Sequence, residues 1–138
     1  MLNVRTRPDI ALLVLRLATG FAFFMHGYQK VFTMGVGGIT EGFTQMGIPL
    51  PGLAAPFISY LELLGGIALM IGILSRVFGF LLACDMLVAT VVVHLKNGFL
   101  GQGGFELTFL LGCMSLATAL AGAGPYSVDA MLAKRRAP

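Results

Sequence analysis

Four apolar stretches, each about as long as a bilayer is thick, limit what this chain can fold into. They cover residues 10–28, 53–74, 77–95 and 105–124. About 20 apolar residues in a helix cross a hydrocarbon core, and inside that core a helix satisfies all of its own backbone hydrogen bonds. The sequence therefore predicts an all-α integral membrane protein built as a bundle of four transmembrane helices.

Composition supports this prediction. Of 138 residues, 57% are hydrophobic and only 11% are charged, whereas soluble domains carry about 25% charged residues. The segments between the spans are too short for a second domain, so we expect a single membrane domain over residues 1–138. The first span carries Arg16 and no small-residue cleavage site follows it, so we expect it to be retained rather than removed as a signal peptide.

The connection between the first two spans, residues 29–52, is the longest one. It places Ile39, Phe43 and Met46 at i, i+4 and i+7, the spacing of one helical face. We expect a short helix here, lying at the membrane interface and ending at Gly47 before two prolines.

The basic residues are distributed unevenly about the spans. One side has Arg5, Arg7, Arg76 and the run Lys134, Arg135, Arg136, and the other has Lys30 and Lys96. The positive-inside rule then predicts that both termini lie in the cytoplasm. This bias also accounts for the net charge of +3, so nucleic-acid binding is not indicated.

Ionisable residues within spans are costly and often functional. Alternating span directions bring six of them to one level, near the outer boundary of the bilayer: His26, Lys30, Glu62, His94, Lys96 and Glu106. We interpret the five other than Lys96, here called the polar layer, as a ligand-binding site, and predict no dedicated metal site because the spacing is nonlocal.

Glu62 is the strongest evidence for a site in this layer. It shares a helical face with Gly65 and Gly66, so it should point into the bundle and need a partner, either Lys30 or His26. The simpler interpretations are that the two histidines bond nearby carbonyls, that Lys96 snorkels to the headgroups, and that Glu106 merely starts the fourth span.

Arg16, Asp85 and the two cysteines lie deeper in the spans. Arg16 and Asp85 have similar depths, and we predict a structural ion pair between them. Asp85 and His94 are nine residues apart, which places them on opposite faces of a regular α-helix. Cys84 and Cys113 form no C-x-x-C motif, and we expect buried thiols.

Several segments resemble the DoxX family of small bacterial membrane proteins. These are Arg16 with Gly20, HGYQK (26–30), GGITEGFTQMGIPLP (37–51), LELLGGIALMIGILSR (61–76), QGGFE (102–106) and GAGPYSVD (122–129). Asp85 and the cysteines are not part of this pattern. The resemblance implies a four-helix inner-membrane protein associated with redox chemistry, since the family is named after a subunit of a thiosulfate:quinone oxidoreductase. Other members look like membrane partners of detoxifying enzymes.

Three functions remain open. The first is a component of a membrane redox or detoxification system that binds a quinone or lipid headgroup, with the polar layer holding the head and the apolar interior the tail. Electrons would come from a redox enzyme partner, because no flavin, nicotinamide or haem motif is evident. The second is a non-catalytic scaffold or assembly factor. The third is a small-solute transporter, which would require a homo-oligomer.

Overall fold

The computed structural model describes residues 7–136, and within that range every regular element is helical. The four long helices are α1 (Pro8–Tyr28), α3 (Pro51–Ile71), α4 (Ser75–Val88) and α5 (Glu106–Ala121). The shorter elements are α2 (Val36–Gln45), α6 (Val128–Arg136), the π-helical segments η1 (Gln29–Thr33) and η2 (Ala89–His94), and the 3-10 turn η3 (Leu95–Asn97).

Three continuous helices are long and apolar enough to cross a membrane: Pro8–Thr33, Pro51–Ile71 and Ser75–Asn97. These are α1 with η1, α3, and α4 with η2 and η3. The fourth apolar helix, α5, is shorter, with 16 residues. The predicted stretches thus correspond to helices, and the expected short helix in the first connection is α2.

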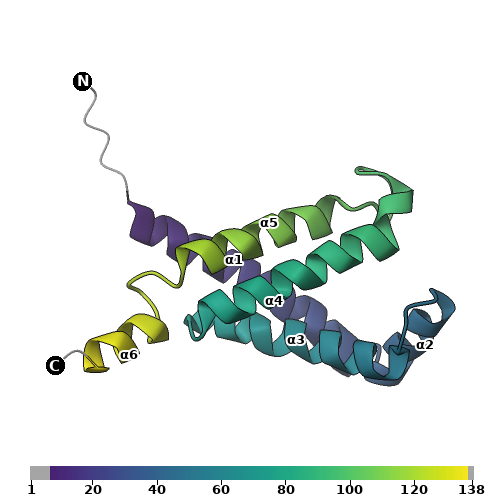
Figure 1. Cartoon of the computed structure of the whole chain (residues 1–138), viewed down its shortest axis with the longest axis horizontal. Helices are drawn as coiled ribbons and strands as arrows, with labels where there is room; N and C mark the ends of the chain where they lie inside the picture. Colours follow the sequence, from purple (N-terminus) through teal and green to yellow (C-terminus); the bar gives the residue numbers. More distant parts are fainter. Residues whose placement is uncertain (1–6, 137–138) are drawn as a thin grey trace.

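The long helices run back and forth along one axis (Figure 1). One end, here called the terminal end, holds the start of α1, the α3–α4 turn, the end of α5, and α6. The opposite end, here called the loop end, holds η1, α2 and the loop of residues 98–105.

Glycines allow α1 and α3 to pack closely. A Cβ atom on Gly27 would overlap the backbone of Leu63, and one on Gly66 would overlap the backbone of Phe24. Gly72 has another role: it ends α3 with a φ of 75°, a conformation that glycine adopts without steric cost.

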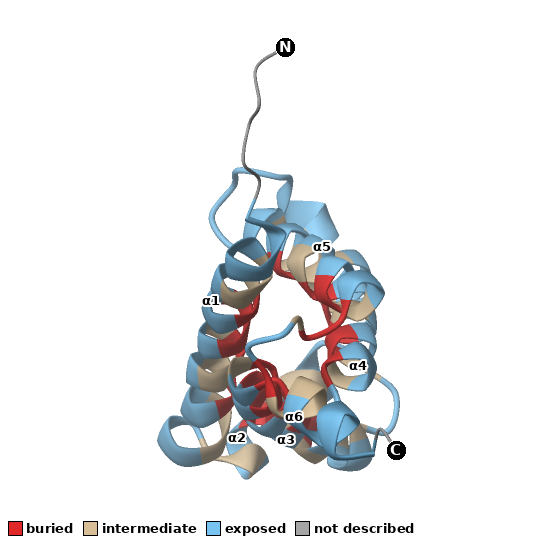
Figure 2. Cartoon of the chain, turned by 90° about the vertical axis from the view of Figure 1, so that its left-hand side faces the viewer, coloured by how far each residue is buried: buried red, intermediate tan, exposed pale blue. Residues whose placement is uncertain are grey.

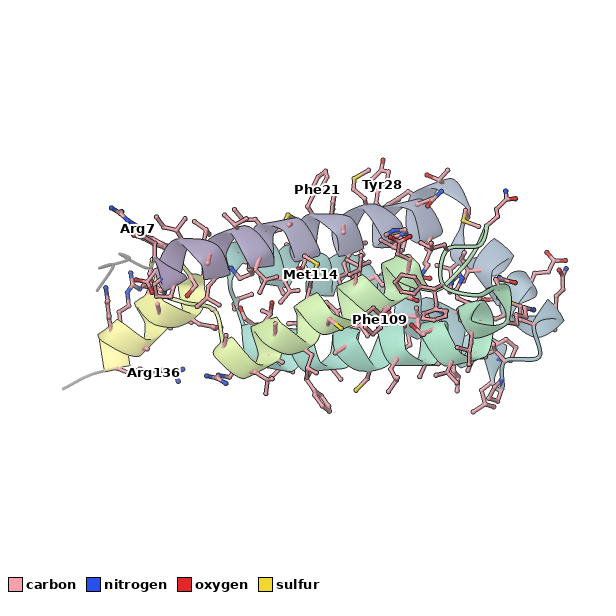
Figure 3. All side chains as sticks on the ribbon, turned by 90° about the horizontal axis from the view of Figure 1, so that it is seen from above. Arg7, Phe21, Tyr28, Phe109, Met114 and Arg136 are labelled. Carbon is pink, nitrogen blue, oxygen red and sulfur yellow. The ribbon has the colours of Figure 1, made fainter. Side chains whose placement is uncertain are left out.

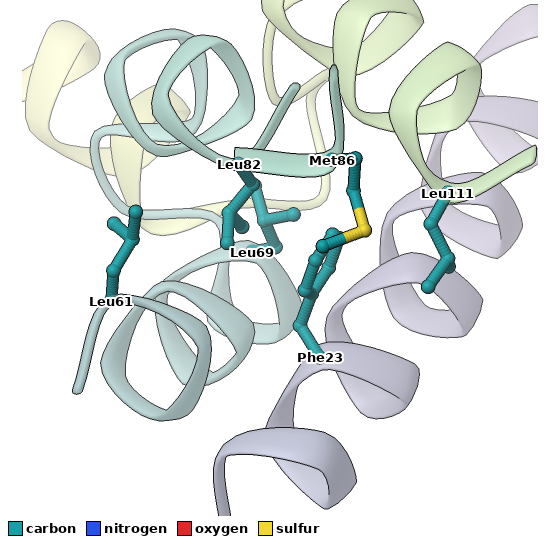
Figure 4. Packing of buried hydrophobic residues seen from close by; sticks show 6 residues of the cluster. All are labelled: Phe23, Leu61, Leu69, Leu82, Met86 and Leu111. Atoms are coloured by element: carbon teal, nitrogen blue, oxygen red, sulfur yellow. The ribbon is translucent and has the colours of Figure 1, made fainter. Parts of the chain in front are cut away.

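The core draws on all four long helices (Figure 4). Its buried side chains are Phe23 from α1, Leu61 and Leu69 from α3, Leu82 and Met86 from α4, and Leu111 from α5. Half of the apolar window of α3 is buried, against 28% for α1 and 22% for α4. Helix α3 is therefore the most buried of these three and packs against α1, α2 and α4, whereas α5 packs against α4 and α1.

The outside of the bundle is apolar as well. Buried residues face inward and exposed ones outward on each long helix (Figure 2), and the exposed set includes large side chains such as Phe21 and Val14. Phe21 and Tyr28 project away from α1 (Figure 3). An exterior of this kind suits contact with lipid rather than water.

Candidate functional site

A salt bridge joins α3 to the end of α1. Lys30 Nζ donates to both carboxylate oxygens of Glu62, each at 2.6 Å. Glu62 is 2% exposed, so the carboxylate points into the bundle as its helical face predicted. Of the two predicted partners the structure shows Lys30. Removing one member of a buried pair typically costs about 3–5 kcal/mol, because the other charge is left uncompensated.

Lys30 lies in a π-helical segment. Met34 N donates to Gln29 O at 2.8 Å, the i→i+5 bond that defines a π-turn. One turn earlier, the close contact of Gly27 with Leu63 fixes α1 against α3. The π-turn changes the direction of the side chains that follow it, and such turns occur frequently at functional sites.

A second π-helical segment, η2, ends at His94. His94 Nδ1 lies 2.7 Å from Gly103 O, and because a carbonyl only accepts, Nδ1 carries the hydrogen. In the neutral ring Nε2 is then an acceptor. The prediction that Asp85 and His94 lie on opposite faces assumed a regular α-helix. Each residue of a π-helix turns the chain by less than an α-helical residue, so that angle does not apply here.

A cavity of about 510 Å³ lies at the loop end, between these elements. Its polar lining contains five of the six residues that the sequence placed at one level: His26, Lys30, Glu62, His94 and Glu106. Glu106 is exposed and is the first residue of α5. The apolar wall of the cavity includes Phe23, Met86, Leu107 and Leu111. Lys96, for which snorkelling was the simpler interpretation, is not part of this lining.

Sequence reasoning missed the loop beside this cavity. Gly101, Gly103 and Gly104 line it, and Gly103 O also accepts from Asn97 Nδ2 at 3.0 Å. Phe99 stacks edge-on against Phe105 and Phe109, which holds the loop on α5. The glycine-rich run GFLGQGG was the available signal, since glycines let a backbone approach a ligand closely.

Asp85 belongs to the loop-end cluster rather than to Arg16. Its carboxyl group lies near the charged groups of Glu62 and Lys30. Among the described residues, none donates a hydrogen bond to its buried Oδ2. A buried carboxyl oxygen without a donor therefore lies beside the Lys30–Glu62 pair.

Arg16 forms a different set of contacts, at the terminal end. Its Nη2 donates to Tyr126 O at 2.6 Å, and the nearest opposite charge acting on it is Asp129. The only salt bridge within residues 7–136 is Lys30–Glu62, so the predicted Arg16–Asp85 ion pair is not formed. The long arginine side chain reaches one acceptor in the folded-back segment after α5, a contact across 110 positions, while its buried Nε and Nη1 have no hydrogen-bond partner among the described residues.

The same segment organises the α3–α4 turn. Asp129 accepts hydrogen bonds from Leu74 N at 2.8 Å and Ser75 N at 3.0 Å, which caps the start of α4. At the end of α5, Arg76 donates to Leu120 O at 2.9 Å. These contacts give the terminal end a structural role. A cavity of about 470 Å³, lined by Arg76, Ser127 and Asp129, also lies there, but Arg76 and Asp129 are already bonded to the backbone.

The polar lining is not arranged as a metal centre. Within the part of the chain that the structure describes, no three His, Cys, Asp or Glu side chains come together closely enough to hold a metal ion. The cavity instead offers an ammonium, an imidazole acceptor, carboxyl groups and an apolar wall. This combination suits an uncharged polar head with hydrogen-bonding oxygens.

Comparison with known proteins identifies the family. The model of the DoxX family matches residues 11–95, which include Lys30, Glu62, Asp85 and His94. The chain belongs to the DoxX family.

Relatives of known name are similar to this DoxX protein along most of their length. "Putative oxidoreductase CatD" of Bacillus subtilis is 34% identical over 91% of the chain and 90% of the relative. An uncharacterized membrane protein of Mycobacterium tuberculosis is 31% identical over 98% of the chain and 88% of the relative. Inner membrane protein YqjF of Escherichia coli is 29% identical over 92% of the chain and 95% of the relative. No solved structure gives a significant match. The chain is thus a membrane protein with inner-membrane relatives.

Proposed function

We propose that this DoxX protein binds the headgroup of a quinone in its loop-end cavity and serves as a component of a membrane redox or detoxification system. The observation that carries this proposal is the meeting of all five polar-layer residues with an apolar wall in one cavity of about 510 Å³. An ammonium has three N–H donors, and Glu62 takes two from Lys30. The third is left for a quinone carbonyl.

The cavity also contains a group that can deliver protons to a quinone. Reduction of a quinone to a quinol adds two electrons and two protons. Both protons come from water, and His94 relays them one at a time: its free Nε2 takes up a proton and passes it to a quinone oxygen. The electrons come from a redox enzyme partner, since the sequence offers no flavin, nicotinamide or haem motif. The name of the Bacillus relative, an oxidoreductase, supports a redox role.

The proposed setting is a four-helix bundle in the inner membrane with both termini in the cytoplasm. Arg7 and Arg136 lie at the same end of the molecule (Figure 3), and Arg76 lies in the turn at that end, as the positive-inside rule requires for a cytoplasmic side. Arg5 lies outside the described residues. Helix α5, with 16 residues, rises about 24 Å. Apolar neighbours at its two ends, Phe105 and Ala123, extend its apolar reach toward the ~30 Å core.

One specific observation favours a second candidate, a scaffold for a partner protein. Lys30 and Glu62 already satisfy each other, so the polar layer has a structural use without any ligand. A transporter needs a continuous path and, for a chain of this size, a homo-oligomer, and it ranks third. The quinone proposal predicts that the purified protein retains a quinone and that Glu62→Gln loses it. The scaffold proposal predicts no retained quinone and a functional protein with Glu62→Gln.

Purification in mild detergent followed by extraction and mass spectrometry of bound small molecules tests the proposal. We expect quinone near one molecule per chain, and its loss in Glu62→Gln and Lys30→Ala. Glu41→Gln, which changes an exposed carboxylate on α2, is the matched control and should retain quinone. Well-folded protein without quinone would refute the headgroup site and leave the scaffold.

A further inference from the structure

A second cavity, of about 340 Å³, lies between α4 and α5. Its lining is almost entirely apolar and includes Phe80, Leu87, Phe109 and Leu116. Both cysteines, Cys84 and Cys113, also line it and are exposed, which corrects the expectation of buried thiols. We call this the α4–α5 groove. Its exposed apolar side chains place it on the surface that faces lipid.

The groove and the loop-end cavity share two lining residues, Met86 and Thr108. The wall between them is therefore formed by these side chains. Met86 lies beside Phe23 in the core (Figure 4), and methionine is unbranched and changes rotamer easily. On the other side Gly112 keeps the wall thin, since a Cβ added there would lie 3.3 Å from Met86 Cβ.

The polar atoms at this junction are already satisfied. Thr90 Oγ1 donates to Thr108 Oγ1 at 2.7 Å, and Thr108 Oγ1 donates to Phe105 O at 3.1 Å. No hydroxyl at the junction then requires water, so an opening of this wall by a change of the Met86 rotamer would suit an apolar chain.

We infer that the α4–α5 groove holds the hydrophobic tail of the ligand whose headgroup occupies the loop-end cavity, an isoprenoid or alkyl chain that passes Met86 and Thr108. This inference rests on the proposed quinone site and adds the class of ligand, a lipid-soluble quinone with a long tail. It also adds the route, because such a molecule enters sideways from the bilayer without drawing its tail through water.

The packing of the bundle supports the groove over the interior as the place of the tail. Phe23, Leu69 and Leu82 are 0% exposed and fill the centre of the bundle, where the sequence had suggested the tail would lie. The groove in contrast is a hollow on the lipid side and adjoins the polar cavity.

A matched pair of quinones tests the inference on the full-length protein in nanodiscs. Decylubiquinone carries a ten-carbon tail and duroquinone carries none, and both rings are fully substituted, so neither adds to thiols. In Cys113→Phe the groove is filled from α5. We expect affinity for decylubiquinone to fall about tenfold, with affinity for duroquinone unchanged. Leu110→Phe, an exposed position on α5 outside the groove lining, is the matched control and should change neither.

The two native cysteines provide a second readout that needs no variant. They are the only cysteines in the chain, so a membrane-permeant maleimide reports on the groove alone. Decylubiquinone at saturation should slow their labelling about tenfold, and duroquinone should leave the rate unchanged.

The outcomes separate this inference from the proposed function. If duroquinone binds wild-type protein, and decylubiquinone neither loses affinity in Cys113→Phe nor protects the thiols, the tail site is wrong and the headgroup site stands. If neither quinone binds wild-type protein, both are wrong.

Discussion

Lys30 and Glu62, 32 positions apart, form a salt bridge at 2.6 Å that joins the π-helical end of α1 to the middle of α3. The pair lies on the wall of the loop-end cavity, with Asp85 beside it. One contact thus connects helix packing, charge compensation inside an apolar bundle, and the chemistry offered to a ligand.

Breaking this salt bridge should destabilise the protein strongly. Lys30→Ala leaves the Glu62 carboxylate buried without its cation, and we expect a loss of about 3–5 kcal/mol in the free energy of unfolding. Unfolding in detergent followed by circular dichroism measures the loss. The double variant Lys30→Met with Glu62→Leu removes both charges and should recover most of the stability. A single variant as stable as wild type would show that the pair is not buried as described.

Asp85→Asn should be tolerated. Asparagine has the shape of aspartate, removes the charge of a buried side chain and brings an N–H donor near Glu62. We expect a change within about 1 kcal/mol, measured by the same unfolding assay. Asp85→Leu has similar size but no donor, and should cost more. Equal losses in both variants would show that a donor at position 85 contributes nothing.

Gly27→Ala should disrupt the contact between α1 and α3. The added Cβ would overlap the backbone of Leu63, so the helices must move apart, at a cost of about 1–3 kcal/mol. Gly37→Ala on α2 is the matched control, because a Cβ there meets nothing within 4 Å. Thermal unfolding should show a large fall for the first variant and none for the second. Equal melting temperatures would contradict the close approach.

Asp129→Ala should weaken the α3–α4 turn. The substitution removes the acceptor of the Leu74 and Ser75 amides, a helix cap worth about 0.5–2 kcal/mol. Because the turn lies at the terminal end, away from the cavity, quinone retention by folded protein should be unchanged. An unchanged free energy of unfolding would mean that the capping contact contributes nothing. Loss of bound quinone at unchanged stability would show that the turn at the terminal end affects the loop-end cavity.

Much of the architecture could be predicted from the sequence. The spans are visible because each apolar stretch matches the length that a bilayer imposes, and Glu62 on a glycine-lined face could only point inward. The five residues of the polar layer follow from the alternation of span directions, which is set by topology alone.

Other features depend on information that hydrophobic pattern does not carry. The π-turns at η1 and η2 change the direction of Lys30 and His94 without any change in composition. Arg16 donates to Tyr126 O because the segment after α5 folds back toward α1, and no local sequence pattern specifies this contact. The exposure of Cys84 and Cys113 was missed because in a membrane protein the core and the lipid-facing surface are both apolar.

The central claim is that the loop-end cavity holds a quinone head, and photolabelling tests it most directly. An azido-quinone, bound to the full-length protein in nanodiscs, is photolysed, and the labelled peptides are mapped by mass spectrometry. The account predicts labels on residues lining the cavity, such as His26, Leu107 and Gly103, and their loss in Glu62→Gln. Labels confined to exposed apolar faces such as that of Phe21, equal in wild type and variant, would contradict it.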